Sequence, residues 1–370
     1  MTTSATRQLF LRLLAVQPAV TAEELLTDVD WQELHRLSLI HQVFPLVYQG
    51  LKPFRELLPE PFERYRALFA TNLARNSALA RETDRILHTL DQAGIEVCCR
   101  RGPQLARAIY GDPGLRVFAD IDLFLQEESI SPTVALLQQA EYQPELTISP
   151  QQWPGLARIA NQLALRHQQH GWLIELHWRA FSRHYALALD ALDALVAPGA
   201  RPGGGVEAEL LLLLVHGGKH LWRQLKWLVD IDRLLHMADP IDWSRLLGLA
   251  HEAGCLRLVR LGLLLCKSIS TEPYPPDVEA ELADDATAAR LAGRIRQNWF
   301  TMQCGERRFL AEYCTQLALR ERWHDKLQLC WRWPLWPRPE DWLAFPAARD
   351  SLPRLVLLRP LRLADKFLRR

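Results

Sequence analysis

Two acidic residues stand one position apart in an apolar stretch, Asp120-Ile121-Asp122-Leu123-Phe124. In a β-strand the side chains of residues i and i+2 leave on the same face, so both carboxylates point one way while Ile121 and Leu123 face a core. Neighbouring carboxylates raise each other's pKa unless a cation lies between them. Mg²⁺ commonly binds one or two protein carboxylates together with phosphates and water. The pair therefore indicates a metal site, and two solvated acids at a strand end are the alternative.

A third acid lies in a second predicted strand, residues 172–178, where Glu175 and His177 share one face and apolar side chains occupy the other. This strand is expected to form a hairpin with residues 163–168. A glutamate among isoleucine, leucine and tryptophan needs a partner if it is buried. That partner is either a metal ion or a cation such as Arg166 across the hairpin. We expect His177 to orient a neighbour or line an acceptor pocket rather than to bind metal.

Turn residues divide the segment before the acid pair. The sequence predicts a strand over residues 95–100, a tight turn at Gly102 and a helix from Pro103 to Tyr110. Glycine permits close backbone approach, and proline suits the first turn of a helix. A second turn at residues 111–114 leads into the predicted strand 120–126. The two acids thus follow a strand–turn–helix–turn unit.

Residues 101–123 carry a longer pattern, Arg-Gly-Pro-x-Leu-Ala-x-x-x-Tyr-Gly-Asp-Pro-Gly-Leu-Arg-x-x-x-Asp-Ile-Asp-Leu. This pattern resembles the signature of a broad, largely uncharacterised bacterial family of nucleotidyltransferases with the DNA polymerase β-type fold. The family usually has Lys-Gly where this chain has Arg101-Gly102, which keeps the charge but replaces an ammonium with a planar guanidinium. The resemblance implies an α+β fold: a polymerase β-like core of a small mixed sheet with helices, flanked by N- and C-terminal helical regions.

The resemblance also implies a chemistry. An NMP would move from an NTP to an unidentified acceptor with release of pyrophosphate, in the presence of Mg²⁺ or, alternatively, Mn²⁺. In this fold the third acid comes from a strand beside the Asp-x-Asp strand, so Asp120, Asp122 and Glu175 are the expected catalytic and metal-binding residues. The alternatives are a catalytically silent nucleotide-binding sensor or scaffold, and a purely helical interaction protein.

The same resemblance suggests where the nucleotide lies. Helix starts favour anions, so the backbone of Gly102 and the helix start at Pro103 would face the β- and γ-phosphates. Arg101, Arg116 and Lys219 are the expected charge partners, and Arg116 could instead brace the strand that carries the acids.

A later segment adds polar side chains at helical spacing. They are His216, Lys219, His220, Arg223, Trp227 and Asp230, which would share one helical face. The resemblance favours a nucleotide-binding surface in which Lys219 neutralises the triphosphate and Asp230 holds a basic partner. A solvated polar face is the alternative. A zinc site at His216 and His220 lacks an evident third ligand.

The chain is expected to divide into an N-terminal helical region (1–93), a nucleotidyltransferase core (94–196) and a C-terminal helical region that contributes to the cleft (206–370). The segment between the last two, residues 197–205, is rich in proline and glycine and reads as a linker.

Three further stretches carry expectations about structure. Residues 63–93 predict a long amphipathic helix that ends at Gly94. The Trp/Pro-rich residues 331–342 look irregular. The basic, amphipathic tail (353–370) predicts a packed helix, with peripheral membrane contact as the alternative.

Composition limits the partners and the compartment. The chain has 370 residues, 49% of them hydrophobic, and a net charge of +1. Near-neutral charge favours a small-molecule, sugar, peptide or protein acceptor over nucleic acid. The seven cysteines show no disulfide or metal spacing, and no stretch approaches the ~20 apolar residues of a membrane span. We therefore expect a cytoplasmic protein without integral membrane association.

Overall fold

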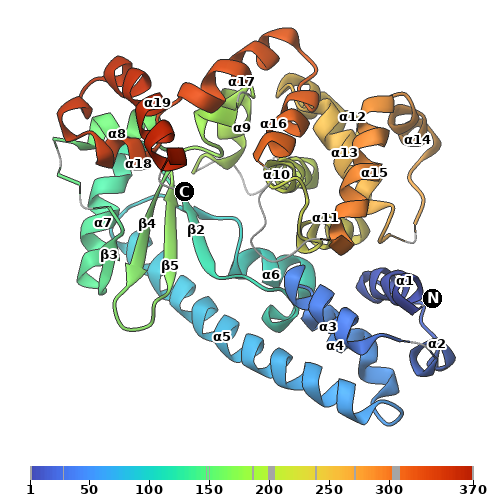
Figure 1. Ribbon diagram of the computed structural model, residues 1–370. Coiled ribbons are helices and arrows are strands. Elements are labelled where there is room, and N and C mark those ends of the chain that lie inside the picture. The colour runs from blue at the N-terminus through green and yellow to red at the C-terminus, as the bar shows by residue number, and fades with distance from the viewer. Residues whose placement is uncertain are drawn as a thin grey trace.

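Helices surround a single five-stranded sheet in the computed structural model (Figure 1). The structure describes residues 2–27, 29–146, 148–149, 151–185, 187–198, 205–237, 240–270, 272–301 and 309–368. The strands run in the order β1-β2-β5-β4-β3, and helices precede and follow the sheet in the chain. The predicted α+β architecture with helical flanks is confirmed.

The elements before and within the sheet region follow in chain order. The N-terminal helices are α1 (Thr2–Leu14), α2 (Ala22–Leu26), α3 (Trp31–Ile40), α4 (Phe44–Leu51) and α5 (Pro59–Gln92). The sheet region contains β1 (Cys98–Cys99), α6 (Pro103–Tyr110), β2 (Asp120–Phe124), α7 (Ile130–Gln139), β3 (Tyr142–Pro144), α8 (Trp153–Ile159), β4 (Gln162–His167), β5 (Leu173–His177), the short helix η4 (Arg183–Tyr185) and α9 (Leu189–Val196).

The described residues of the C-terminal part form helices joined by loops. Its helices are α10 (Val206–Lys219), α11 (Lys226–Met237), α12 (Trp243–Glu252), α13 (Leu256–Cys266), α14 (Pro276–Ala283), α15 (Ala286–Thr301), α16 (Phe309–Ala318), α17 (Trp323–Leu335), α18 (Pro339–Ala344) and α19 (Leu352–Leu368). Of the predicted linker, residues 199–204 lie outside the described residues.

The sheet places the acidic strands side by side. Strands β2 and β5 are parallel, and their register pairs Asp122 with Glu175. The other three pairings are antiparallel, including the predicted β4–β5 hairpin. Alternation sends Ile121, Ile174 and their neighbours to the opposite face, where they are fully buried in a core beneath the sheet.

The long helix α5 fixes the turn that leads into β2. Asn72 donates a hydrogen bond to the carbonyl of Gly114 (2.8 Å), and Asn76 donates to the carbonyls of Pro113 and Arg116 (both 2.7 Å). Both amides are buried. Because buried backbone carbonyls need donors, these two asparagines tie the path of the chain before β2 to a rigid helix.

The helices before and after the sheet share one large hydrophobic core. Leu13 and Leu34 from the N-terminal helices belong to the same cluster as Leu214, Trp222 and Trp299 from the C-terminal ones. A smaller cluster joins α8 with α18 and α19, so the end of the chain packs beside the sheet (Figure 1). The three regions of the sequence are therefore interlocked by their cores.

Three local predictions were wrong. The polar segment after residue 215 does not form one helical face, because α10 ends at Lys219 and α11 begins at Lys226. Leu221 and Trp222 adopt positive φ angles of 52° and 42° and reverse the chain. Residues 331–342 are not irregular but belong largely to α17 and α18. The strand predicted over 95–100 is limited to Cys98–Cys99.

The paired glycines in α10 have a packing reason. A Cβ atom at Gly217 would lie 2.4 Å from Nε1 of Trp222, and one at Gly218 would lie 2.7 Å from Leu258. Trp222 itself is fully buried. The glycines therefore make room for the reversed chain and a neighbouring helix.

Candidate active site

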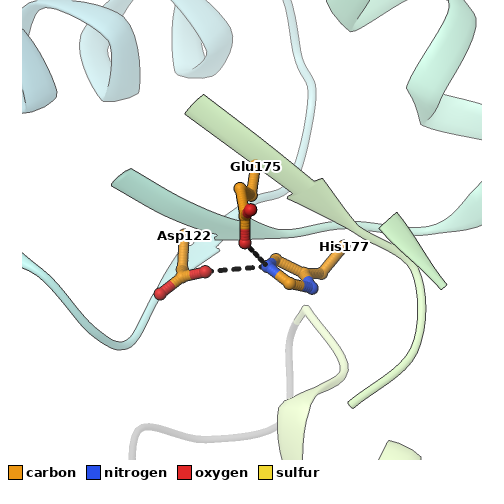
Figure 2. Close-up of side chains that lie close together, drawn as sticks. All are labelled: Asp122, Glu175 and His177. Atoms are coloured by element: carbon orange, nitrogen blue, oxygen red, sulfur yellow. Dashed lines mark hydrogen bonds and ion pairs between the residues drawn. The ribbon is translucent and has the colours of Figure 1, made fainter. Parts of the chain in front are cut away.

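Two acids and a histidine meet above β2 and β5. One ligand atom from each of Asp122, Glu175 and His177 lies within 4.8 Å of the other two (Figure 2). His177 Nε2 is 2.7 Å from Asp122 Oδ1 and 3.4 Å from Glu175 Oε2. The parallel register creates this cluster, since Asp122 and Glu175 are paired neighbours and His177 lies two residues beyond on the same face.

Asp120 lies on the same face, one pair earlier in the register, opposite Leu173. It does not belong to the compact three-residue cluster found among the described residues. Burial raises the pKa of Asp120, and repulsion from Asp122 and Glu175 raises it further. The carboxylates of Asp120, Asp122 and Glu175 therefore lie close enough to repel one another.

Asp122 contacts both a histidine and an arginine. Its side chain is buried, and burial alone would raise its pKa. The guanidinium of Arg101, 3.8 Å away, and the hydrogen bond from His177 outweigh this and hold the pKa well below its usual range. Burial lowers the pKa of His177, but its bonds to Asp122 and Glu175 raise the pKa overall. The Phe124 ring stacks on His177 at 4.8 Å and fixes its plane.

Arg101 connects the acids to the end of α10. Its Nη1 lies 3.0 Å from Nδ1 of His216, and because arginine can only donate, the imidazole accepts. Burial and the Arg101 charge place the pKa of His216 well below its usual range, so the ring is neutral. Burial and Arg101 also lower the pKa of Lys219, whereas Glu175 and Asp122 oppose that shift. The predicted residues Arg101, His216 and Lys219 therefore come together beside the carboxylates.

Gly102 and Pro103 form the expected turn and helix start. Gly102 has φ 61° and ψ −126°, and α6 begins at Pro103. A Cβ atom at Gly102 would lie 2.6 Å from the carbonyl oxygen of Asp120. Glycine is thus required by contact with the first residue of β2.

A sequence profile of a family described as uncharacterised nucleotidyltransferase matches residues 27–270. The chain belongs to this nucleotidyltransferase family. The matched region includes every strand of the sheet and both sides of the candidate site, from Arg101 to Lys219. The comparisons found no match among curated proteins or solved structures. Among the residues that the structure describes, no helix is long and apolar enough to cross a membrane.

A basic partner was expected for Asp230, and in the structure that partner is Arg116. Arg116 Nε lies 3.0 Å from Asp230 Oδ1 and Nη2 lies 2.9 Å from Oδ2, and Tyr110 donates to Oδ1 at 2.8 Å. Both charged side chains are buried. This geometry ties α6 and α11 to the turn before β2, which favours the bracing role of Arg116 over a direct nucleotide contact.

His220 packs against an aromatic neighbour. Its ring stacks on Trp227 at 4.7 Å, and burial together with Lys219 lowers its pKa to about 3. The rings of His216 and His220 are 5.0 Å apart, and no third ligand joins them among the described residues. The structure gives the zinc alternative no support.

The hairpin cation is not the partner of Glu175. Arg166 pairs instead with Glu145, at 2.6 Å.

Lys226 is a further cation whose charge interacts with Asp120 and Asp230, and the sequence analysis did not single it out. Burial and Arg116 lower its pKa to about 8, while Asp230 and Asp120 oppose the shift. Lys226 could not be singled out from the sequence because the chain reversal at Leu221 and Trp222, which places it, was not predicted.

Proposed function

We propose that this protein is a metal-dependent enzyme that transfers an NMP from an NTP to an acceptor and releases pyrophosphate. The observation that carries the proposal is the meeting of Asp122 and Glu175 on adjacent parallel strands, with Asp120 on the same face. Membership of the nucleotidyltransferase family supports the reaction class.

The donor set fits a hard divalent cation. Asp120, Asp122 and Glu175 offer carboxylate oxygens, which Mg²⁺ and Mn²⁺ prefer. Burial raises the pKa of Asp120, and repulsion from Asp122 and Glu175 raises it further; a bound cation would relieve that repulsion. When bound, such an ion neutralises phosphate charge and orients the reacting groups. His177 is already hydrogen-bonded to Asp122, so we propose that its role is to orient that carboxylate.

The remaining residues have roles toward the triphosphate and the acceptor. Arg101 and Lys219 supply positive charge beside the acids, and the start of α6 after Gly102 offers backbone N–H groups to phosphate oxygens. The acceptor oxygen forms a bond to the α-phosphorus as the bond to pyrophosphate breaks. Glu175, which is partly exposed, accepts the acceptor's proton.

The net charge of the chain bears on the class of the acceptor, and the state of its cysteines bears on the compartment. Net charge of +1 favours a small molecule, sugar, peptide or protein side chain over nucleic acid. The cysteines among the described residues are free thiols, which supports a reducing cytoplasm.

The test is transfer of an α-³²P label from each NTP into cell-extract acceptors, with pyrophosphate measured in parallel. Asp120→Asn combined with Asp122→Asn should abolish labelling, and Asp84→Asn, in an exposed ion pair on α5, should not. Labelling that survives the double substitution contradicts the proposal. Calorimetry separates the sensor alternative, which predicts Mg²⁺-dependent NTP binding without pyrophosphate release.

A further inference from the structure

A second group of cations adjoins the active site where the chain leaves β5. Arg179 and Arg183 follow that strand, and Arg332 and Arg338 come from α17 and the turn before α18. Figure 1 shows α17, α18 and α19 gathered around the end of the molecule that holds α8 and α9. Residues far apart in the sequence thus converge beside Lys219, the last residue of α10.

Direct contacts hold this convergence together. Arg332 Nη1 donates to the carbonyl of Arg183 at 3.3 Å. The His184 ring lies 5.8 Å from the Trp333 ring, and the Tyr185 hydroxyl donates to the carbonyl of Gly218 at 3.4 Å. Helix η4 is therefore packed between α17 and the end of α10.

The positive charge of the group is largely unpaired. Within the described residues, Arg183, Arg332, Arg338 and Lys219 form no ion pair, and Arg179 reaches only Glu127, at 3.6 Å. Two acids follow Arg338 in the sequence: Glu340 is exposed and forms no ion pair with it among the described residues, and Asp341 is already bonded by Arg359 and Arg362.

Several of these guanidinium groups are also short of acceptors. Nη1 of Arg179, Nε of Arg332 and Nε of Arg338 are buried and have no hydrogen-bond partner among the described residues. Buried charged donors without partners are costly, and a guanidinium matches phosphate or carboxylate oxygens in planar, bidentate geometry. The group is therefore suited to an anion.

The contacts of η4 lead toward the end of α10, because Tyr185 donates to the carbonyl of Gly218, the residue before Lys219. Burial, then the positive charges of Arg338 and Lys219, lower the pKa of His184 to about 3. Burial and Arg101 lower the pKa of Lys219, and the negative charges of Glu175 and Asp122 oppose this shift. The end of α10 therefore links the two groups, since Gly218 contacts η4 while His216 contacts Arg101, which lies 3.8 Å from Asp122.

We propose that Arg179, Arg183, Arg332 and Arg338 bind an anionic group, phosphate or carboxylate, carried by the acceptor substrate. The assignment to the acceptor rests on the proposed function, in which Arg101, Lys219 and the start of α6 take the triphosphate. The new cations come from the segment after β5, from η4, from α17 and from the turn before α18, so they are separate from the α6 side of the site. An acceptor anchored there would place a nearby hydroxyl group next to Glu175.

The test uses the full chain saturated with Mg²⁺ and inorganic triphosphate, a probe that occupies phosphate subsites whatever the base. Inorganic phosphate is then titrated by calorimetry. We expect phosphate still to bind, and Arg332→Gln with Arg338→Gln to weaken it by about tenfold or more. The affinity for Mg²⁺-triphosphate should stay within about twofold. Arg354→Gln, which removes an exposed charge on α19, should change neither affinity.

Two results overturn the proposal: phosphate that is displaced by inorganic triphosphate, which makes the group part of the triphosphate site, and phosphate affinity unchanged in the double variant. If the glutamine variant does not fold, Arg332→Lys with Arg338→Lys keeps the charge and should weaken phosphate binding by a smaller factor. Asp120→Asn with Asp122→Asn should retain phosphate binding. Failure of NMP transfer is thereby distinguished from failure of the anion site.

Discussion

The backbone of Gly102 lies directly against Asp120. The site for a Cβ atom on Gly102 is 2.6 Å from the Asp120 carbonyl oxygen, and Gly102 has a positive φ of 61°. Both facts exclude a side chain at this position without local movement. The turn after β1 and the first residue of the acidic strand therefore form one rigid unit.

Gly102→Ala should consequently lower the free energy of unfolding by more than the difference in conformational preference between glycine and alanine. Strained backbone of this kind costs on the order of 1–3 kcal/mol, and the displaced Asp120 carbonyl adds to it. We expect a lower urea midpoint and a lower kcat for NMP transfer. The control is Gly111→Ala, where φ is 67° but no atom lies within 4 Å of the new Cβ. Equal losses in the two variants would show that the contact with Asp120 is unimportant.

Local patterns predicted the acidic strands well. Alternation along residues 120–125 and 172–178 set which side chains face the core, and Ile121 and Ile174 are indeed fully buried. The turn at Gly102 and the helix from Pro103 also depend on neighbouring residues in the sequence, so they were predictable. The family resemblance led us to expect a basic partner for Asp230, but it did not identify Arg116 as that partner.

Long-range packing determined what the sequence did not reveal. The reversal at Leu221 and Trp222 is stabilised by burial of Trp222 against Gly217, which helical spacing alone cannot anticipate. The return of the C-terminal helices to the sheet depends on contacts such as Gly155 against the carbonyl of Arg349, where a Cβ atom would lie at 2.7 Å. The contact of Arg332, in α17, with Arg183, in η4, also depends on that return.

The Arg116–Asp230 pair should contribute to stability rather than to nucleotide affinity. Asp230→Asn would leave the buried Arg116 guanidinium without its carboxylate, a change that typically costs about 3–5 kcal/mol. Urea unfolding should show this loss, while calorimetry of the folded protein should give nearly unchanged NTP affinity. Asp84→Asn breaks an exposed pair with Arg107 and should cost less than about 1 kcal/mol. A large loss of NTP affinity in Asp230→Asn would assign the pair to the nucleotide site.

Mg²⁺ should stabilise the folded protein through the carboxylate cluster. A ligand that binds only the native state at 100 times its Kd adds about 2.7 kcal/mol. We expect thermal unfolding with added Mg²⁺ to shift to higher temperature, and EDTA to reverse the shift. In Asp122→Asn and in Glu175→Gln the difference with and without Mg²⁺ should be strongly reduced. An undiminished shift in both variants would place the ion elsewhere.

His41 should make the protein sensitive to acid. It is fully buried, its Nε2 donates to the Trp299 carbonyl at 2.9 Å, and its Nδ1 accepts from the Leu225 N–H at 3.3 Å. Burial is the main cause that lowers its pKa from 6.5 to about 4. Because both ring nitrogens are engaged by a donor and an acceptor, the native state holds the neutral ring.

The sign of the effect follows from the lowered pKa. Between pH 6.5 and 4 the unfolded chain binds more protons at this residue than the native chain, so the free energy of unfolding falls as the pH falls. At about 1.36 kcal/mol per pH unit, the loss approaches about 3 kcal/mol near pH 4. His41→Gln cannot titrate, so its urea-measured stability should depend less steeply on pH over this range. His88→Gln, exposed on α5, is the matched control and should keep the wild-type slope. Identical slopes in all three proteins would mean that His41 is protonated in the native state as readily as in the unfolded chain.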